Sequence, residues 1–255
     1  MNKIQENRNA MKCPNFSRGM KKTDQQNGVP HPPHNREATG ELIILPGFDG
    51  VVANDSYTTL LDVRRSLRTY DTETPMTQAQ LAYMLYTAFS IQEIKGKNGE
   101  ATMRPVPSGG ARHAFEVYAV VQNVEGLGKG VYRYVPTANV GEKVVSIEFV
   151  SEIENHPETV AEMLASQGWT KNAPVVIFIT CIPYRAEWRY GEMAHRVVLI
   201  DLGHMGQNIM LSAASLGLGS CCIAAFDQKA SDTHLKVDGN NEFTVYAITV
   251  GKAKE

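Results

Sequence analysis

The chain has 255 residues, of which 43% are hydrophobic and 20% are charged, and its formal net charge is −2. This is the composition of a globular protein that is long enough for one large core or two small ones. The small net charge argues against a general nucleic-acid-binding surface and against a surface for anionic membranes, but it leaves room for a local basic pocket.

The N-terminus and the cysteines bear on the cellular compartment. The first ten residues are polar and lack the apolar core of a signal peptide, and no apolar run approaches membrane-spanning length. The four cysteines, Cys13, Cys181, Cys221 and Cys222, form no CxxC motif and no disulfide framework. We therefore expect a cytoplasmic protein with no membrane partner.

Residues 1–41 are polar and interrupted by Pro, Gly and Asn, and they include the proline-rich segment from His31 to His34. This composition is typical of a flexible tail or of a segment that drapes over another part of the fold. The two histidines fit a proline-rich linker more simply than a metal site. We expect a flexible tail over 1–41 and a single folded domain over 42–255.

Three arginines, Arg64, Arg65 and Arg68, fall within five residues just after a short helical segment at 57–63. Arginine keeps its charge near neutral pH and offers a planar set of donors, which suits a phosphate or an oxygen of a flavin ring. Short charged runs are weak motifs, so a solvated basic turn is the simpler interpretation of this cluster taken alone.

A helix is predicted after Thr77. Thr77 and Gln80 make a capping-box pattern, and the apolar residues from Leu81 to Phe89 follow the helical period, so that one face belongs in the core.

A glycine-rich loop follows at 104–113. Pro107 fixes the backbone and Gly109 and Gly110 free it, so that N–H groups and the Ser108 hydroxyl come close to a flat ligand. A structural turn is the alternative interpretation of this loop.

The second half of the chain alternates strands and helices. Strands are predicted at 115–121, 131–135, 144–150, 174–181 and 243–250, and the first two are joined by a hairpin at 127–130. The strand at 174–181 is apolar on both faces, as an interior strand is. A short helix is predicted at 157–166, and Asp227 is expected to cap another.

Residues 184–216 show a helical pattern with a break near Gly191. The part from 197 to 216 is apolar nearly all round, which is typical of a helix at the centre of a fold or of a dimer. Asp201 and His204 lie one turn apart. A buried hydrogen-bonded pair explains them better than a metal site, which needs a third ligand, so we predict no metal.

Four landmarks occur in a fixed order along the chain, namely Arg64–Arg68, Pro107–Gly110, Gly203–Asn208 and Gly217–Asp227. Their joint order and spacing resemble the FMN-dependent nitroreductase family, and the closest branch looks like the SagB-type dehydrogenases, which include azoline oxidases of thiazole/oxazole peptide biosynthesis. The resemblance implies an α+β fold, in which a largely antiparallel central sheet is flanked by helices, with a long buried central helix.

The resemblance also implies a homodimer with FMN at each subunit interface, and it assigns contacts residue by residue. The phosphate, ribityl chain and pyrimidine edge of FMN are expected to contact Arg64, Arg65, Ser66 and Arg68, with Lys252 at the phosphate. The flavin ring is expected to pack on Pro107, Ser108, Gly109 and Gly110 of the other subunit. It is also expected to contact Cys222, Ile223, Ala224 and Ala225, with Gln207 at the ribityl chain or ring edge.

The chemistry of the residues agrees with a flavin. A phosphate binds two or three cations, and an arginine beside the reduced ring stabilises the negative charge that gathers there. Because the flavin itself performs the redox step, the absence of a clear nucleophile–base set in the sequence is no obstacle. Cys221 and Cys222 invite a redox role, but buried packing is the interpretation we favour, since a vicinal disulfide is strained.

We expect NAD(P)H to reduce FMN and a small acceptor, such as a nitroaromatic compound or a quinone, to reoxidise it by a ping-pong mechanism. A peptide-azoline dehydrogenase and a flavin carrier without turnover are the alternatives. The azoline-oxidising branch typically has Lys-Tyr where this chain has Arg189-Tyr190, and arginine is too basic to shuttle a proton. Tyr190 and Arg189 are the catalytic candidates, and His113 is a further residue that could face a substrate.

Overall fold

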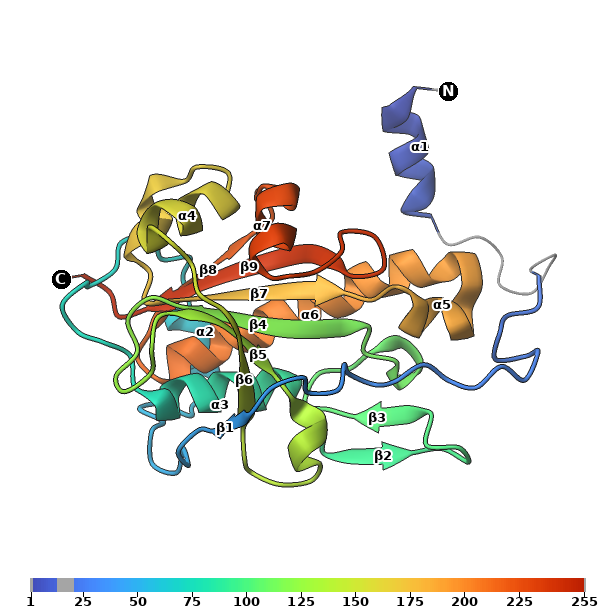
Figure 1. The fold of residues 1–255 in the computed structure, drawn as a ribbon, viewed down its shortest axis with the longest axis horizontal. Coiled ribbons are helices and arrows are strands. Elements are labelled where there is room, and N and C mark those ends of the chain that lie inside the picture. Colours follow the sequence, from blue (N-terminus) through green and yellow to red (C-terminus); the bar gives the residue numbers. More distant parts are fainter. Residues whose placement is uncertain (1, 13–20, 255) are drawn as a thin grey trace.

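The computed structural model describes residues 2–12 and 21–254. Its centre is a seven-stranded sheet in the order β1-β6-β5-β4-β7-β9-β8, in which every pairing is antiparallel (Figure 1). The strands are β1 (Leu42–Ile44), β4 (Phe115–Val121), β5 (Gly130–Tyr134), β6 (Ser146–Ser151), β7 (Val175–Cys181), β8 (Gly219–Ile223) and β9 (Phe243–Gly251). A separate hairpin pairs β2 (Glu93–Lys95) with β3 (Ala101–Met103). The predicted α+β class with a largely antiparallel sheet is confirmed.

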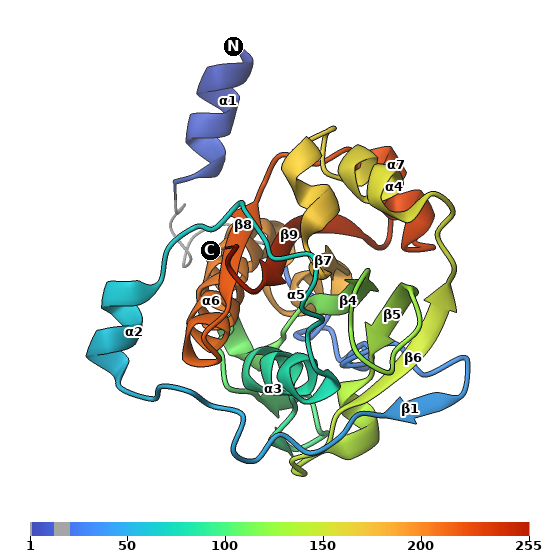
Figure 2. The same cartoon turned by 90° about the vertical axis from the view of Figure 1, so that its left-hand side faces the viewer.

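The structure describes seven α-helices, some of which cover the two faces of the sheet. They are α1 (Lys3–Ala10), α2 (Tyr57–Val63), α3 (Gln78–Phe89), α4 (His156–Met163), α5 (Tyr184–Tyr190), α6 (Ala194–Ser215) and α7 (Gln228–His234). Figure 2 shows α3 and α6 on one side of the sheet and α4 and α7 on the other. Two apolar clusters result, one on each side, because alternate residues of β4 and β7 point to opposite faces. Within the described ranges, no helix combines the length and the apolar character that crossing a membrane requires.

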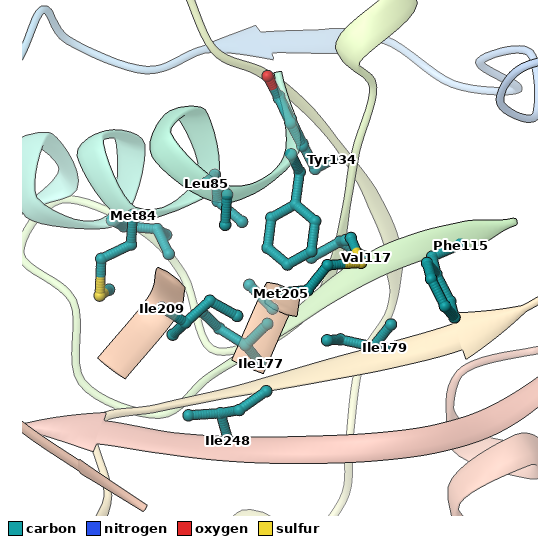
Figure 3. Packing of buried hydrophobic residues seen from close by; sticks show 14 of the residues in the cluster. Met84, Leu85, Phe115, Val117, Tyr134, Ile177, Ile179, Met205, Ile209 and Ile248 are labelled. Atoms are coloured by element: carbon teal, nitrogen blue, oxygen red, sulfur yellow. The ribbon is translucent and has the colours of Figure 1, made fainter. Parts of the chain in front are cut away.

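The larger cluster lies between the sheet and the pair α3 and α6. Figure 3 shows Met84 and Leu85 of α3 and Met205 and Ile209 of α6 beside Ile177 and Ile248 of the sheet. The capping box predicted from Thr77 and Gln80 is present, since Thr77 Oγ1 accepts from Gln80 N at 3.1 Å and Gln80 Oε1 accepts from Thr77 N at 2.9 Å. The helix thus begins and faces the core as its sequence predicts.

The N-terminal segment differs from its prediction. Residues before Leu42 already pack on the folded domain. Asn35 is 5% exposed, and the Arg185 guanidinium donates to Pro33 O at 2.9 Å. The start of the folded region near Leu42 is therefore placed too late, although the interpretation of this stretch as a draped segment agrees with the structure. Helix α1 projects from the body and has no buried residue (Figure 1). Cys13 lies outside the described residues.

The long helix α6 contributes residues to the larger apolar cluster along much of its length. The predicted break near Gly191 is present, and Gly217, at φ +71°, ends α6 in the way that glycine C-caps do. The sequence predicts that α6 is buried nearly all round, but in the single chain only one face of this helix is buried. Leu199 is 66% exposed and Ile200 is 46% exposed, so an apolar face of α6 is uncovered in the isolated chain.

Candidate functional site

The arginine segment is held beside the sheet edge by backbone hydrogen bonds. Leu67 N donates to Ser220 O at 2.9 Å, and Asp71 N donates to Lys252 O at 3.0 Å. The segment lies beside β8 at Ser66 and beside the residues that follow β9 at Tyr70. Residues that are far apart in the sequence therefore meet at this sheet edge. Lys252 approaches the Asp71 carboxylate at 3.6 Å. The structure therefore brings the predicted phosphate residue Lys252 to the same edge as the arginines.

A cavity of about 270 Å³ opens at this edge. It is lined by Val63, Arg64, Arg65, Leu67, Met210, Ala214, Gly217, Leu218, Gly219, Ser220 and Ala253. Arg64 and Arg65 thus reach the cavity, whereas the guanidinium of Arg68 lies 5.9 Å from the centre of the Trp169 ring and lines no part of it. The C-terminal end of α6 forms one wall.

The two arginines that line this cavity pair with no carboxylate among the residues that the structure describes, whereas Lys252 pairs with Asp71. Neither Arg64, Arg65 nor Arg68 makes an ion pair with any residue that the structure describes, and Arg65 donates only to the neighbouring Arg64 O at 2.7 Å. Two guanidinium groups without a carboxylate partner beside a small cavity are a donor set that suits a phosphate group. The residues present therefore fit the phosphate end of FMN.

The glycine-rich loop lies elsewhere in the chain, against the first half of α6. Ser108 Oγ donates to Asp201 Oδ2 at 2.6 Å, and Gly109 N donates to the same carboxylate at 3.1 Å. Asp201 therefore binds the loop, and it makes no hydrogen bond with His204, contrary to the predicted pairing. The Ser108 hydroxyl proton is also committed to protein, so it is not a free donor toward a flat ligand.

The two catalytic candidates lie against this loop. Gly110 adopts φ +59°, and a Cβ atom there would lie 2.5 Å from the Tyr190 hydroxyl and 2.6 Å from Arg189 Cδ. Only glycine fits such close contact at positive φ. Arg189 Cζ is 5.9 Å from the centre of the Tyr190 ring. Arg189, Tyr190 and the loop thus form one surface at the N-terminal half of α6.

His113, in contrast, does not face a substrate. Its side chain is 3% exposed, and burial, with a smaller contribution from the charge of Arg104, lowers its pKa to about 2. The suggestion from the sequence that His113 faces the substrate is wrong, because the ring is part of the interior.

The residues from Cys222 to Ala225, which were expected to contact the flavin ring, lie at the end of β8 and directly after it. Ile223 is buried, while Ala224 and Ala225 are exposed and free to contact a ligand. Cys222 is half-buried, and burial raises the pKa of its thiol. Cys181, Cys221 and Cys222 are free thiols. The sequence missed Tyr246 of β9, whose ring would touch a Cβ at Gly206 at 2.8 Å and whose side chain contacts Cys222.

The two groups of candidates are separated along α6. Asp201 contacts the loop, whereas Met210 and Ala214 of α6 line the arginine cavity. These residues follow Asp201 by 9 and 13 positions, which corresponds to about 14–20 Å along the helix. One chain therefore does not bring Pro107–Gly110 to the arginines. Gln207 lies between the two groups on the exposed face of α6. Such an arrangement provides two half-sites, one beside the first half of α6 and one beside its second half.

The fold and these half-sites define a class of protein, one that binds an anionic cofactor beside a helix-flanked antiparallel sheet. A model of the nitroreductase family matches residues 61–252, which is most of the chain. The nitroreductase-type protein MJ1384 of Methanocaldococcus jannaschii is 30% identical over 84% of this chain and 97% of its own length. The chain belongs to the nitroreductase family, as its landmarks predicted. The predicted class of enzyme, an FMN-dependent oxidoreductase of the nitroreductase type, is likewise confirmed.

Two further comparisons extend this. The microcin B17-processing protein McbC of Escherichia coli is 26% identical to this chain. The aligned region covers 70% of this chain and 63% of McbC. A solved nitroreductase-type structure from Ralstonia eutropha superposes with a TM-score of 0.65 at 21% identity, covering 89% of this chain and 99% of that one. The second comparison shows the shared fold, and the first supports the predicted likeness to peptide-processing members.

Proposed function

We propose that the chain binds FMN and catalyses NAD(P)H-driven reduction of a small nitroaromatic or quinone-like acceptor by a ping-pong mechanism. The observation that carries this proposal is the set of unpaired arginines, Arg64 and Arg65, at a cavity beside Lys252 in a nitroreductase-family chain. When bound, FMN supplies the redox chemistry by accepting a hydride from the donor and passing it to the acceptor in a separate half-reaction.

The residues of the chain then bind and orient. Arg64 and Arg65 donate to the phosphate and Ser66 lies beside them, while Lys252 adds a further positive charge. Arg68 stacks near Trp169 in the isolated chain and joins the phosphate or the ring edge only if its side chain turns. The exposed backbone at Ala224 and Ala225 offers a flat surface to the ring, as does the loop from Pro107 to Gly110. Tyr190 stands beside that loop as a proton donor or stacking residue for the acceptor.

A homodimer completes the site in this proposal. The loop contact at Asp201 and the cavity-lining residues Met210 and Ala214 are separated by about 14–20 Å along α6, so in this proposal the loop that covers a given flavin comes from the second subunit. The exposed apolar face of α6, which includes Leu199 and Ile200, is a surface that a second copy would cover.

A peptide dehydrogenase is the second candidate, and the likeness to McbC favours it. Arg189 stands against it, because a guanidinium keeps its proton and cannot act as the acid–base group that a lysine provides. Tyr190, whose hydroxyl lies against Gly110, remains available for proton transfer in either reaction.

The test of the proposed function is flavin binding by the purified protein and its reduction by NADH or NADPH without oxygen. We expect flavin absorption that bleaches with one of the two nucleotides. Replacing both Arg64 and Arg65 by Gln should weaken FMN binding about 100-fold, because each charge-assisted hydrogen bond contributes about 1.5 kcal/mol or more. The matched control replaces two exposed lysines, Lys143 and Lys229, by Gln and should bind FMN normally.

Three results separate the candidates. Protein that takes up no FMN on reconstitution contradicts the proposal. Flavin that binds but is bleached only by a thiazoline- or oxazoline-containing peptide favours the peptide dehydrogenase. Unchanged FMN affinity in the Arg64 and Arg65 double variant would place the phosphate elsewhere.

A further inference from the structure

Asp201 connects the long helix to the glycine-rich loop through two hydrogen bonds. Its carboxylate accepts the Ser108 hydroxyl proton at 2.6 Å and the Gly109 N–H at 3.1 and 3.2 Å. Ser108 Oγ in turn accepts from His113 N at 3.0 Å, so the hydroxyl group bridges both ends of the loop. One carboxylate thus fixes a loop that runs from residue 107 to residue 113.

The carboxylate has an unusual position for a charged group. Asp201 is 7% exposed, and it forms no ion pair with any residue that the structure describes. Burial raises its pKa, while the bonds from Ser108 and Gly109 and the charge of His204 lower it. A buried carboxylate is costly unless hydrogen bonds compensate it, and these donors all come from the loop.

The loop needs such a contact because its backbone is strained. Gly110 has φ +59°, and two non-glycine residues, Ala111 and His113, have φ of +54° and +43°. Residues other than glycine adopt this region only where surrounding contacts hold them there. The Val197 side chain fills the space where a Cβ of Gly109 would lie, so the loop rests directly on α6.

We propose that Asp201 is a positioning residue of the flavin site, which locks the Pro107–Ala111 loop in the shape that packs on the flavin ring. This inference rests on the proposed function, in which that loop covers a flavin. Asp201 does not touch the flavin. It acts through Ser108 and Gly109, whose donors it occupies, and it thereby holds the loop against Val197 of α6.

The chain supplies a matched control in Asp232. Asp232 is 6% exposed and accepts from Thr244 N at 2.7 Å and Thr244 Oγ1 at 2.8 Å, so it too is a buried carboxylate that binds one hydroxyl and one backbone N–H. It also accepts from Gln228 Nε2 at 2.9 Å. It lies on α7, on the face of the sheet opposite α6 (Figure 2). Asp232→Asn should therefore cost similar stability without reaching the loop.

The experiment compares Asp201→Asn, Asp232→Asn and the unmodified chain by hydrogen exchange without flavin and by FMN titration. Asp201→Asn should speed amide exchange in residues 106–113 about tenfold or more and raise the Kd for FMN about tenfold, while Asp232→Asn changes neither. Ser108→Ala, which keeps the Gly109 contact, should give smaller changes in the same direction. Should Asp201→Asn fail to fold, Ser108→Ala carries the test alone.

The opposite results are as definite. Faster loop exchange with unchanged FMN affinity would make Asp201 a purely structural residue and overturn the inference. Equal effects of Asp201→Asn and Asp232→Asn would do so as well, because the loss would then be general destabilisation. If the unmodified chain binds no FMN, the proposed function itself is wrong. If the unmodified chain binds FMN and Asp201→Asn binds it equally tightly, only the role of Asp201 is wrong.

Discussion

Burial decides the protonation of the histidines near the site. The His113 ring is 3% exposed, and its burial lowers its pKa to about 2, while burial lowers the pKa of His34 to about 4. Both rings are therefore neutral in the native state at any pH near neutrality. In the unfolded chain each would titrate near pH 6.5.

The first prediction concerns acid stability. Between pH 6.5 and pH 5 the unfolded chain binds protons at His113 and His34 that the native state does not, so the free energy of unfolding falls as the pH falls. Each histidine contributes up to about 1.4 kcal/mol per pH unit. His113→Asn, which also tolerates positive φ, should give a shallower pH dependence in urea denaturation.

The control for this prediction is His195, whose side chain is 66% exposed. It lies on the surface beside Glu187 at 2.8 Å, and His195→Asn should not make the pH dependence shallower. A slope that His113→Asn does not change would mean that the native ring accepts a proton in this range, contrary to its buried position.

At the scale of elements, the N-terminal segment is fixed by buried charges. The Glu116 carboxylate is fully buried and pairs with Arg185 at 2.6 Å and with Arg133 at 3.2 Å. It also accepts from Arg36 N at 2.6 Å, and Arg133 donates to Arg36 O at 3.0 Å. Backbone groups of the segment thus complete an ion-pair network on the sheet.

The second prediction follows from that network. Glu116→Gln removes the carboxylate that pairs with Arg185 and should lower the free energy of unfolding by about 3–5 kcal/mol, because it leaves a buried charge uncompensated. The segment from residue 21 to residue 41 should also become sensitive to protease. Glu158→Gln breaks only the exposed pair with Lys171 and should cost less than about 1 kcal/mol.

Urea denaturation and limited proteolysis of the two variants check this prediction. A loss below about 1 kcal/mol for Glu116→Gln, with the segment still resistant, would show that packing rather than the ion pairs holds residues 21–41.

Local patterns predicted the elements well. The capping box at Thr77, the doubly apolar strand β7 and the glycine that ends α6 are each written in neighbouring residues, so their positions were readable from the chain. The network around Glu116 was not, because its members come from Arg36 to Arg185 and each looks like an ordinary surface charge in the sequence. For the same reason the bond between Ser108 and Asp201 was missed, since 93 residues separate them.

At the scale of the whole molecule, α6 sets where each half-site can work. The loop lies near Asp201, and Met210 and Ala214 further along the helix line the arginine cavity. In the proposed function, a single chain therefore presents two incomplete sites along α6. Two copies packed through α6 in opposite directions would place the loop of one beside the arginines of the other. In that arrangement a chain that cannot dimerise would also bind FMN weakly.

The last prediction tests that connection. Leu199 is 66% exposed on α6, and a lysine there would place a charge in the proposed subunit interface. Leu199→Lys should therefore produce monomers in sedimentation velocity and, in the same sample, weaken FMN binding about 100-fold or more, although every arginine is intact. Ile44→Lys is the matched control, because Ile44 is 68% exposed on edge strand β1, away from α6. It should leave both the dimer and FMN binding unchanged. If Leu199→Lys is monomeric but binds FMN as tightly as the unmodified chain, one chain holds the complete flavin site and the loop acts within its own subunit.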